Sequence, residues 1–224
     1  MNSRRPTMPF AALAVAATLL PFSGCGPSSE RDSIEFEPNL VHAMKYQIKE
    51  GIETGQASDD AFWILEQYFG TPDEPRIPPT LEEEDFAGLI SLERLQRASG
   101  PESAEGRGLF RKHCVSCHGV TGNGRGELSA VSDPYPRDYR AGIFKFKSTK
   151  RGSKPLREDL ANSIRHGIAG TTMKAIPELT EDDIQALVDY VIYLSLRGEL
   201  ERSLLDEAVF EGLLEDGIRI VNRE

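Results

Sequence analysis

Apolar side chains recur every three or four residues along much of this chain, which is the spacing of an amphipathic α-helix. Polar and charged residues fill the positions between them, so each pattern has one apolar face. The patterns cover residues 40–52, 59–69, 83–98, 158–168, 178–197 and 199–216. The sequence therefore predicts an all-α fold in which helices pack their apolar faces against one another.

The first pattern has an apolar stripe made of Leu40, Met44, Ile48 and Ile52. We expect this stripe, and those of the two patterns that follow it, to pack onto the domain formed by residues 101–198 and to enlarge its core. Docking of a partner protein is the alternative role for residues 39–100.

The pattern at 178–197 carries signals for both of its ends. Thr180 is suited to cap the helix, and the acidic residues that follow it favour the positive end of the helix dipole. Arg197 followed by Gly198 is typical of a helix C-terminus. We therefore expect the helix to end there and residues 199–216 to form a separate amphipathic helix.

Composition narrows the class of protein. The 224 residues are 39% hydrophobic and 28% charged, which is typical of a globular chain and not of a disordered or collagen-like one. Three cysteines are an odd number and cannot form a complete disulfide framework. The formal net charge of −10 argues against nucleic acid as a partner, because phosphate binding requires a basic surface.

The start of the chain has the order of an export signal. Two arginines precede an apolar run at residues 10–22, which is too short to be identified as a membrane-spanning helix and leads through small residues to Cys25. This ending resembles a bacterial lipobox, which implies that Cys25 is lipidated. Cleavage that leaves Cys25 as a free thiol is the alternative. We expect the protein at the outer, periplasmic side of a bacterial membrane, held there by a lipid anchor.

Cys114, Cys117 and His118 form the pattern Cys-x-x-Cys-His, which is the attachment pattern of a c-type haem. Two thiols on one helical turn add to the two vinyl groups, and the next residue supplies an imidazole to the iron. A thioredoxin-like redox pair would not need His118, and no βαβ pattern surrounds the motif. A zinc site would need further soft ligands, and Cys25 is the only other cysteine. Covalent haem is the preferred interpretation.

The flanking residues extend the match. Residues 106–113 form a short helical segment before the motif, and a glycine-rich loop after it leads to the segment 133–139. Residues 102–197 resemble a class I, single-haem bacterial cytochrome c, which implies the fold of that family and one covalent haem c. The predicted organisation is a signal at 1–24, a tether at 25–38, a helical extension at 39–100, the haem domain at 101–198 and a C-terminal helix or tail at 199–224.

The resemblance also implies roles for single residues. The carbonyl of Pro134, with that of Pro136 as the alternative, is expected to accept a hydrogen bond from His118 and so to fix the imidazole tautomer. The long helix is expected to place Tyr190 against the first helix near Gly106, where the missing side chain permits a close approach.

The family takes its sixth iron ligand from a Gly-Thr-x-Met-Pro turn, and residues 170–174 stand in that place with lysine instead of the proline. The resemblance implies that Met173, 55 residues after His118, is the second axial ligand. A soft thioether favours ferrous iron and raises the reduction potential. His166 is the main competitor, but its setting is typical of a helix C-terminus. His113 is expected to point away from the haem.

Charge is uneven along the chain, because residues 107–157 carry twelve basic and three acidic side chains. We expect the basic segment 137–157 to lie beside the haem edge and to steer an acidic redox partner, such as an oxidase, a reductase or a dehydrogenase. A solvated loop that offsets nearby carboxylates is the alternative.

The predicted function is single-electron transfer, not enzymatic catalysis. Two other functions stay open. One is a haem enzyme, or a sensor of gas or peroxide, with an open sixth iron position. The other is a fixed cytochrome subunit of a larger redox complex.

Overall fold

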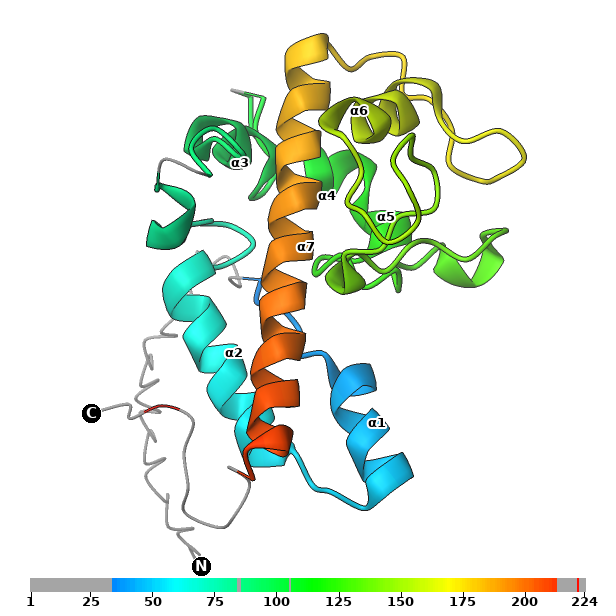
Figure 1. Cartoon of the computed structure of the whole chain (residues 1–224). Coiled ribbons are helices and arrows are strands. Elements are labelled where there is room, and N and C mark those ends of the chain that lie inside the picture. The colour runs from blue at the N-terminus through cyan, green and yellow to red at the C-terminus, as the bar shows by residue number, and fades with distance from the viewer. Residues whose placement is uncertain (1–33, 84–85, 105, 213–220, 222–224) are drawn as a thin grey trace, which may run out of the picture. The chain divides into compact units, whose positions relative to one another are not determined.

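The computed structural model describes residues 34–83, 86–104, 106–212 and 221. Within these ranges the chain forms seven α-helices and three 3₁₀ helices and no strand, so the predicted all-α fold is confirmed (Figure 1). The α-helices are α1 (Leu40–Glu50), α2 (Gly55–Phe69), α3 (Leu92–Ala98), α4 (Leu109–His113), α5 (Val115–His118), α6 (Arg157–His166) and α7 (Glu181–Phe210). The 3₁₀ helices are η1 (Pro79–Leu81), η2 (Ser129–Val131) and η3 (Tyr139–Ala141). None of these helices is long and apolar enough to cross a membrane.

Helix α7 is the element against which α2, α3, α6 and η3 pack (Figure 1). It begins as the sequence predicts, because the Thr180 hydroxyl accepts a hydrogen bond from the backbone N–H of Asp183. The predicted end at Arg197 and Gly198 is wrong, because α7 continues to Phe210 and so includes residues 199–210 of the segment expected to form a separate helix. A Cβ at Gly198 would lie 2.3 Å from Cα of Arg140 in η3, so the glycine permits close packing of two elements.

The core lies where α2, α3 and α4 meet the middle of α7. Tyr193 is fully buried and its hydroxyl donates to the Phe69 carbonyl in α2. The Tyr190 ring lies 4.9 Å from the Phe110 ring of α4. The predicted close approach at Gly106 is wrong, because Gly106 precedes α4 and a Cβ there would meet nothing within 4 Å. Phe110 supplies the contact instead.

The pattern at 83–98 gives a shorter helix than predicted. Helix α3 begins only at Leu92, and Gly88 before it has a φ of +83°, which no right-handed helix accommodates. The backbone N–H of Ser91 donates to the carboxylate of Asp189, 2.7 Å away, and this bond attaches the start of α3 to α7.

Helix α1 exists as predicted, but its expected inward face is wrong. Leu40, Met44 and Ile48 are 59%, 50% and 74% exposed. The opposite face is buried because its polar groups find a partner on α7. His42 Nε2 lies 2.6 Å from Asp206 Oδ1, and the Tyr46 hydroxyl donates to the same carboxylate.

The predicted signal at 1–24 and the predicted lipidation site Cys25 lie outside the described residues. Of the predicted tether, residues 34–38 are described, and they pack on the folded part of the chain. The Phe36 ring is 5% exposed and lies 6.3 Å from the Tyr193 ring. The side-chain amide of Asn123, in the glycine-rich loop, donates to Glu37 at 2.8 Å.

Candidate functional site

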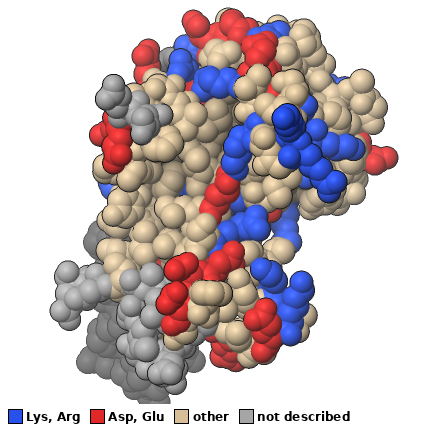
Figure 2. All heavy atoms as spheres, in the orientation of Figure 1, with Lys and Arg blue, Asp and Glu red and all other residues tan. Residues whose placement is uncertain are grey.

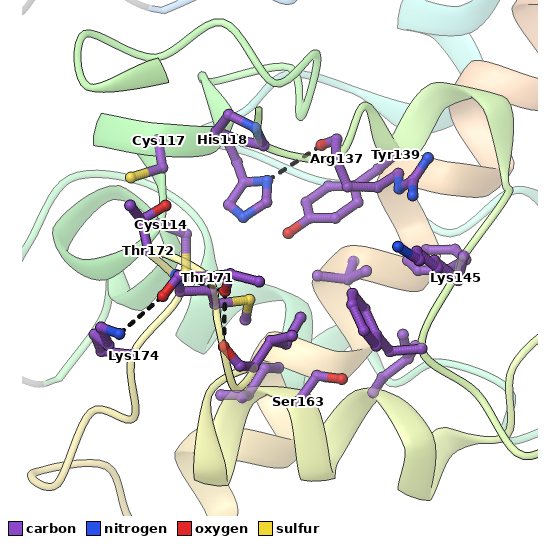
Figure 3. Close-up of a pocket in the computed structure, with 18 of the residues that line it drawn as sticks. Cys114, Cys117, His118, Arg137, Tyr139, Lys145, Ser163, Thr171, Thr172 and Lys174 are labelled. Atoms are coloured by element: carbon purple, nitrogen blue, oxygen red, sulfur yellow. Dashed lines mark hydrogen bonds between the residues drawn. The ribbon is translucent and has the colours of Figure 1, made fainter. Parts of the chain in front are cut away.

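A cavity of about 350 Å³ opens between α5, α6, α7 and the loops that follow α5 and α6 (Figure 3). This volume falls in the range of sites that hold cofactors and other small molecules, roughly 300–1,000 Å³. Apolar side chains of α6 and α7, among them Leu160, Ile164, Leu187 and Val191, form part of its wall. The chemically distinctive lining residues are Cys114, Cys117, His118, Tyr139 and Met173.

The two cysteines reach the cavity because α4 and α5 are short and meet at Cys114. Cys114 ends α4, and α5 then carries Cys117 and His118 on its single turn. Both thiols are free. Burial raises the pKa of the Cys114 thiol to about 12, so this thiol is protonated at neutral pH.

His118 is held by a backbone carbonyl, as the sequence analysis expects, but not by that of Pro134. Its Nδ1 lies 3.2 Å from the carbonyl oxygen of Arg137, so the assignments to Pro134 and Pro136 are wrong (Figure 3). The loop is positioned by the backbone bond from Tyr139 N–H to the Gly122 carbonyl, which brings residue 137 to the imidazole. Burial lowers the pKa of His118, so a neutral imidazole is favoured, with Nδ1–H donating and Nε2 available to a metal.

Tyr139 is a lining residue that sequence reasoning missed. Its ring stacks on the imidazole of His118, with centroids 4.6 Å apart and planes at 17°, and the Phe144 ring follows at 6.0 Å. Burial raises the pKa of the Tyr139 hydroxyl well above its usual value. The Tyr139 ring restrains the imidazole across its face, whereas the Arg137 carbonyl restrains it at Nδ1.

Met173 reaches the cavity from the loop after α6, and backbone hydrogen bonds within this loop hold it in place. The N–H of Ile168 donates to the Met173 carbonyl at 2.9 Å, and the N–H of Met173 donates to the Thr171 hydroxyl at 3.1 Å. Lys174, which stands where the family has proline, donates from Nζ to the Thr171 carbonyl at 2.8 Å. A Cβ at Gly167 would lie 2.6 Å from the Met173 carbonyl oxygen, so only glycine permits this approach.

The two histidines considered beside Met173 as possible iron ligands lie at different places relative to the cavity. His166 is the last residue of α6, is exposed and does not line the cavity, in agreement with its expected position at a helix C-terminus. His113 was expected to point away from the haem and instead lines the cavity, where its Nδ1 lies 3.9 Å from Glu178. In the described part of the chain, no three His, Cys, Asp or Glu side chains converge in the way a zinc site requires.

The basic segment 137–157 adjoins the cavity, and Lys145 is one of the lining residues (Figure 3). Figure 2 shows blue side chains gathered on this part of the surface. Two of the lysines are engaged locally, because Lys147 donates to Thr149 and Lys154 pairs with Glu199. The exposed cations of the segment include Arg137 and Lys145, which line the cavity, and Lys150 and Arg151 further along the chain.

These residues fit a c-type haem. Two neighbouring thiols, a neutral imidazole and a thioether from a separate loop face one largely apolar cavity, and the buried Nε2 of His118 is left for a metal. Cys114 and Cys117 would attach the group, and His118 and Met173 would hold its iron.

Comparison with known proteins found a family match over part of the chain. The family described as Cytochrome c matches residues 103–195. A solved structure of the Kuenenia stuttgartiensis reducing HAO-like protein complex contains a chain with 31% sequence identity and a TM-score of 0.36, which covers 50% of this chain. The present chain spans 45% of that protein's length. No curated protein sequence matches significantly.

Proposed function

We propose that the protein, in which residues 103–195 match the Cytochrome c family, carries one covalent haem c and transfers single electrons between redox proteins. The observation that carries the proposal is the convergence of Cys114, Cys117 and His118 with Met173 on one cavity, although the last of these lies 55 residues further along the chain. When bound, haem c supplies an iron that alternates between the ferric and ferrous states.

The surrounding residues would support this activity by restraining the two side chains that would hold the iron. The Arg137 carbonyl and the Tyr139 ring restrain the imidazole of His118, and hydrogen bonds around Thr171 restrain the loop of Met173. With His118 and Met173 both holding the iron, little reorganisation would accompany a change of oxidation state, which would favour electron transfer over binding of a substrate.

The exposed cations Arg137 and Lys145, which line the cavity, support an acidic redox partner that docks beside it. Electrostatic steering by such a surface accelerates association and weakens with salt. The partner would be an oxidase, a reductase or a dehydrogenase on the outer side of a bacterial membrane, where the export signal would place the protein. Electron-transfer rates that do not vary with ionic strength would contradict this mode of docking.

The first test is a mass spectrum and a visible spectrum of the protein expressed with haem-attachment machinery. We expect the polypeptide mass to increase by one haem. We also expect the ferric protein to show the weak long-wavelength charge-transfer band of iron with a methionine ligand. A polypeptide without added mass would overturn the proposed function.

Replacing Met173 by alanine separates an electron carrier from a haem enzyme or sensor. We expect the variant to lose the charge-transfer band, to have a lower reduction potential and to bind carbon monoxide in the ferrous state. Met44→Ala is the matched control, because Met44 is half exposed on α1 and does not line the cavity. An unchanged potential in Met173→Ala, or carbon monoxide binding by the parent protein, would favour an open sixth position.

A further inference from the structure

Helix α1 presents an apolar face to solvent. Leu40, Val41, Met44 and Ile48 are 59%, 51%, 50% and 74% exposed, and their spacing places them on one side of the helix. A surface helix of a globular protein normally turns such a face toward the core. In α1 the arrangement is reversed, so the apolar face is available to something outside the folded chain.

The reversed orientation is fixed by specific contacts. His42 and Tyr46 both bind the carboxylate of Asp206 in α7, and Ala43 packs against Leu205 in a small buried cluster. Rotation of α1 to bury its apolar face would break both polar contacts and expose the alanine. The apolar face is therefore held outward.

Basic residues border this face. Lys45 and Lys49 are exposed, and the helical period places them on one flank of the apolar stripe, between it and the buried face. An apolar face bordered by lysines is the pattern of a helix that lies in the surface of a membrane with anionic lipids. A second copy of the chain is a poorer fit, because a stable dimer buries some 20–30 residues on each side.

The position of α1 in the chain also favours a membrane. Lipidation of Cys25, if the proposed export is correct, would leave eight residues between the anchor and Ile34, the first described residue. The nine residue steps from Cys25 to Ile34 span at most about 30 Å. Helix α1 begins six residues after Ile34, so the anchor would keep its apolar face close to the bilayer.

We propose that the outward face of α1, made of Leu40, Val41, Met44 and Ile48 with Lys45 and Lys49 beside it, lies in the surface layer of an anionic membrane. The biological setting rests on the proposed export, whereas the interaction itself requires neither the lipid anchor nor electron transfer.

The test uses the haem-loaded chain from residue 26 onward, exported behind a cleavable signal. This chain retains every residue that the structure describes. We expect it to sediment with vesicles of phosphatidylglycerol and phosphatidylethanolamine. The double variant Leu40→Gln, Ile48→Gln should bind about 30-fold more weakly, because it lacks two large apolar side chains whose transfer from water to lipid favours binding. Lys45→Gln with Lys49→Gln should weaken binding to these vesicles but not to uncharged ones.

The matched control is Leu128→Gln with Val131→Gln, which removes two exposed apolar side chains from the region of η2 and should bind vesicles like the parent. Equal binding by the α1 variant and the parent would overturn the proposal. The proposal would also fail if the parent protein did not bind vesicles. This holds whether the parent is a monomer or forms a dimer that the α1 substitutions dissociate. Visible spectra of the same proteins keep the two proposals apart, because a normal haem spectrum with no vesicle binding refutes only the membrane contact.

Discussion

Replacing Gly198 by alanine would test how closely α7 and η3 approach each other. The added Cβ would lie 2.3 Å from Cα and 2.4 Å from Cβ of Arg140. Neither atom is the end of a flexible side chain, so the backbone of η3 would have to move away from α7. Tyr139 precedes Arg140 and stacks on His118, so this displacement would also reach the cavity.

The magnitude follows from two opposing effects. In an exposed helix interior, glycine is about 1 kcal/mol less favourable than alanine, so the same substitution there would stabilise the protein. Insertion of a methyl group into a packed contact costs about 1–3 kcal/mol, and a contact with backbone atoms belongs at the upper end of that range. We therefore expect Gly198→Ala to lower the free energy of unfolding by about 2 kcal/mol and Tm by about 4–8 °C.

Urea and thermal unfolding of the haem-loaded protein, followed by circular dichroism, would measure both quantities. Gly55→Ala is the matched control, because Gly55 is also helical and a Cβ there would meet nothing within 4 Å. We expect this control to be neutral or to gain up to about 1 kcal/mol. If Gly198→Ala were as stable as the parent, the close approach to Arg140 would not require a glycine at position 198.

Replacing Asp189 by asparagine would remove a fully buried carboxylate that binds the side chains of Arg94 and Arg157. We expect a loss of about 3 kcal/mol in urea titration, and a loss below about 1 kcal/mol would show that solvent compensates both guanidiniums. Burial, which outweighs the hydrogen bond and attraction of Asp206, lowers the pKa of His42. Its contribution to stability should therefore be complete above about pH 6.5 and be lost as the pH falls toward the folded-state pKa. His42→Gln should show a flatter stability profile over about pH 5–7, and equal slopes in the two proteins would contradict this role.

Periodicity identified helices well but could not determine which face each one buries. The stripe of α1 has the correct spacing, yet the buried side is the one with His42 and Tyr46. Their partner Asp206 lies more than 150 residues away in the sequence. Gly198 shows the same limit, because the contact with Arg140 that requires a glycine is invisible to local pattern.

Within the candidate site, local chemistry was predictable and backbone geometry was not. Cys114, Cys117 and His118 are recognisable because covalent haem attachment requires them side by side. The group that faces Nδ1 of His118 is a backbone carbonyl, which every residue possesses, so Arg137 has no sequence signature. Placing Tyr139 against the imidazole required the path of the loop that the Gly122 carbonyl holds.

Because α7 is one uninterrupted helix, it fixes the distance between the cavity and helix α1. Val191 lines the cavity and Asp206 holds α1, and fifteen residues of helix separate them, a rise of about 22 Å. If α1 lies on lipid and the cavity holds haem, as proposed, α7 would keep the haem at a set distance from the headgroups. Partners would then be selected by the height of their own donor or acceptor as well as by their charge.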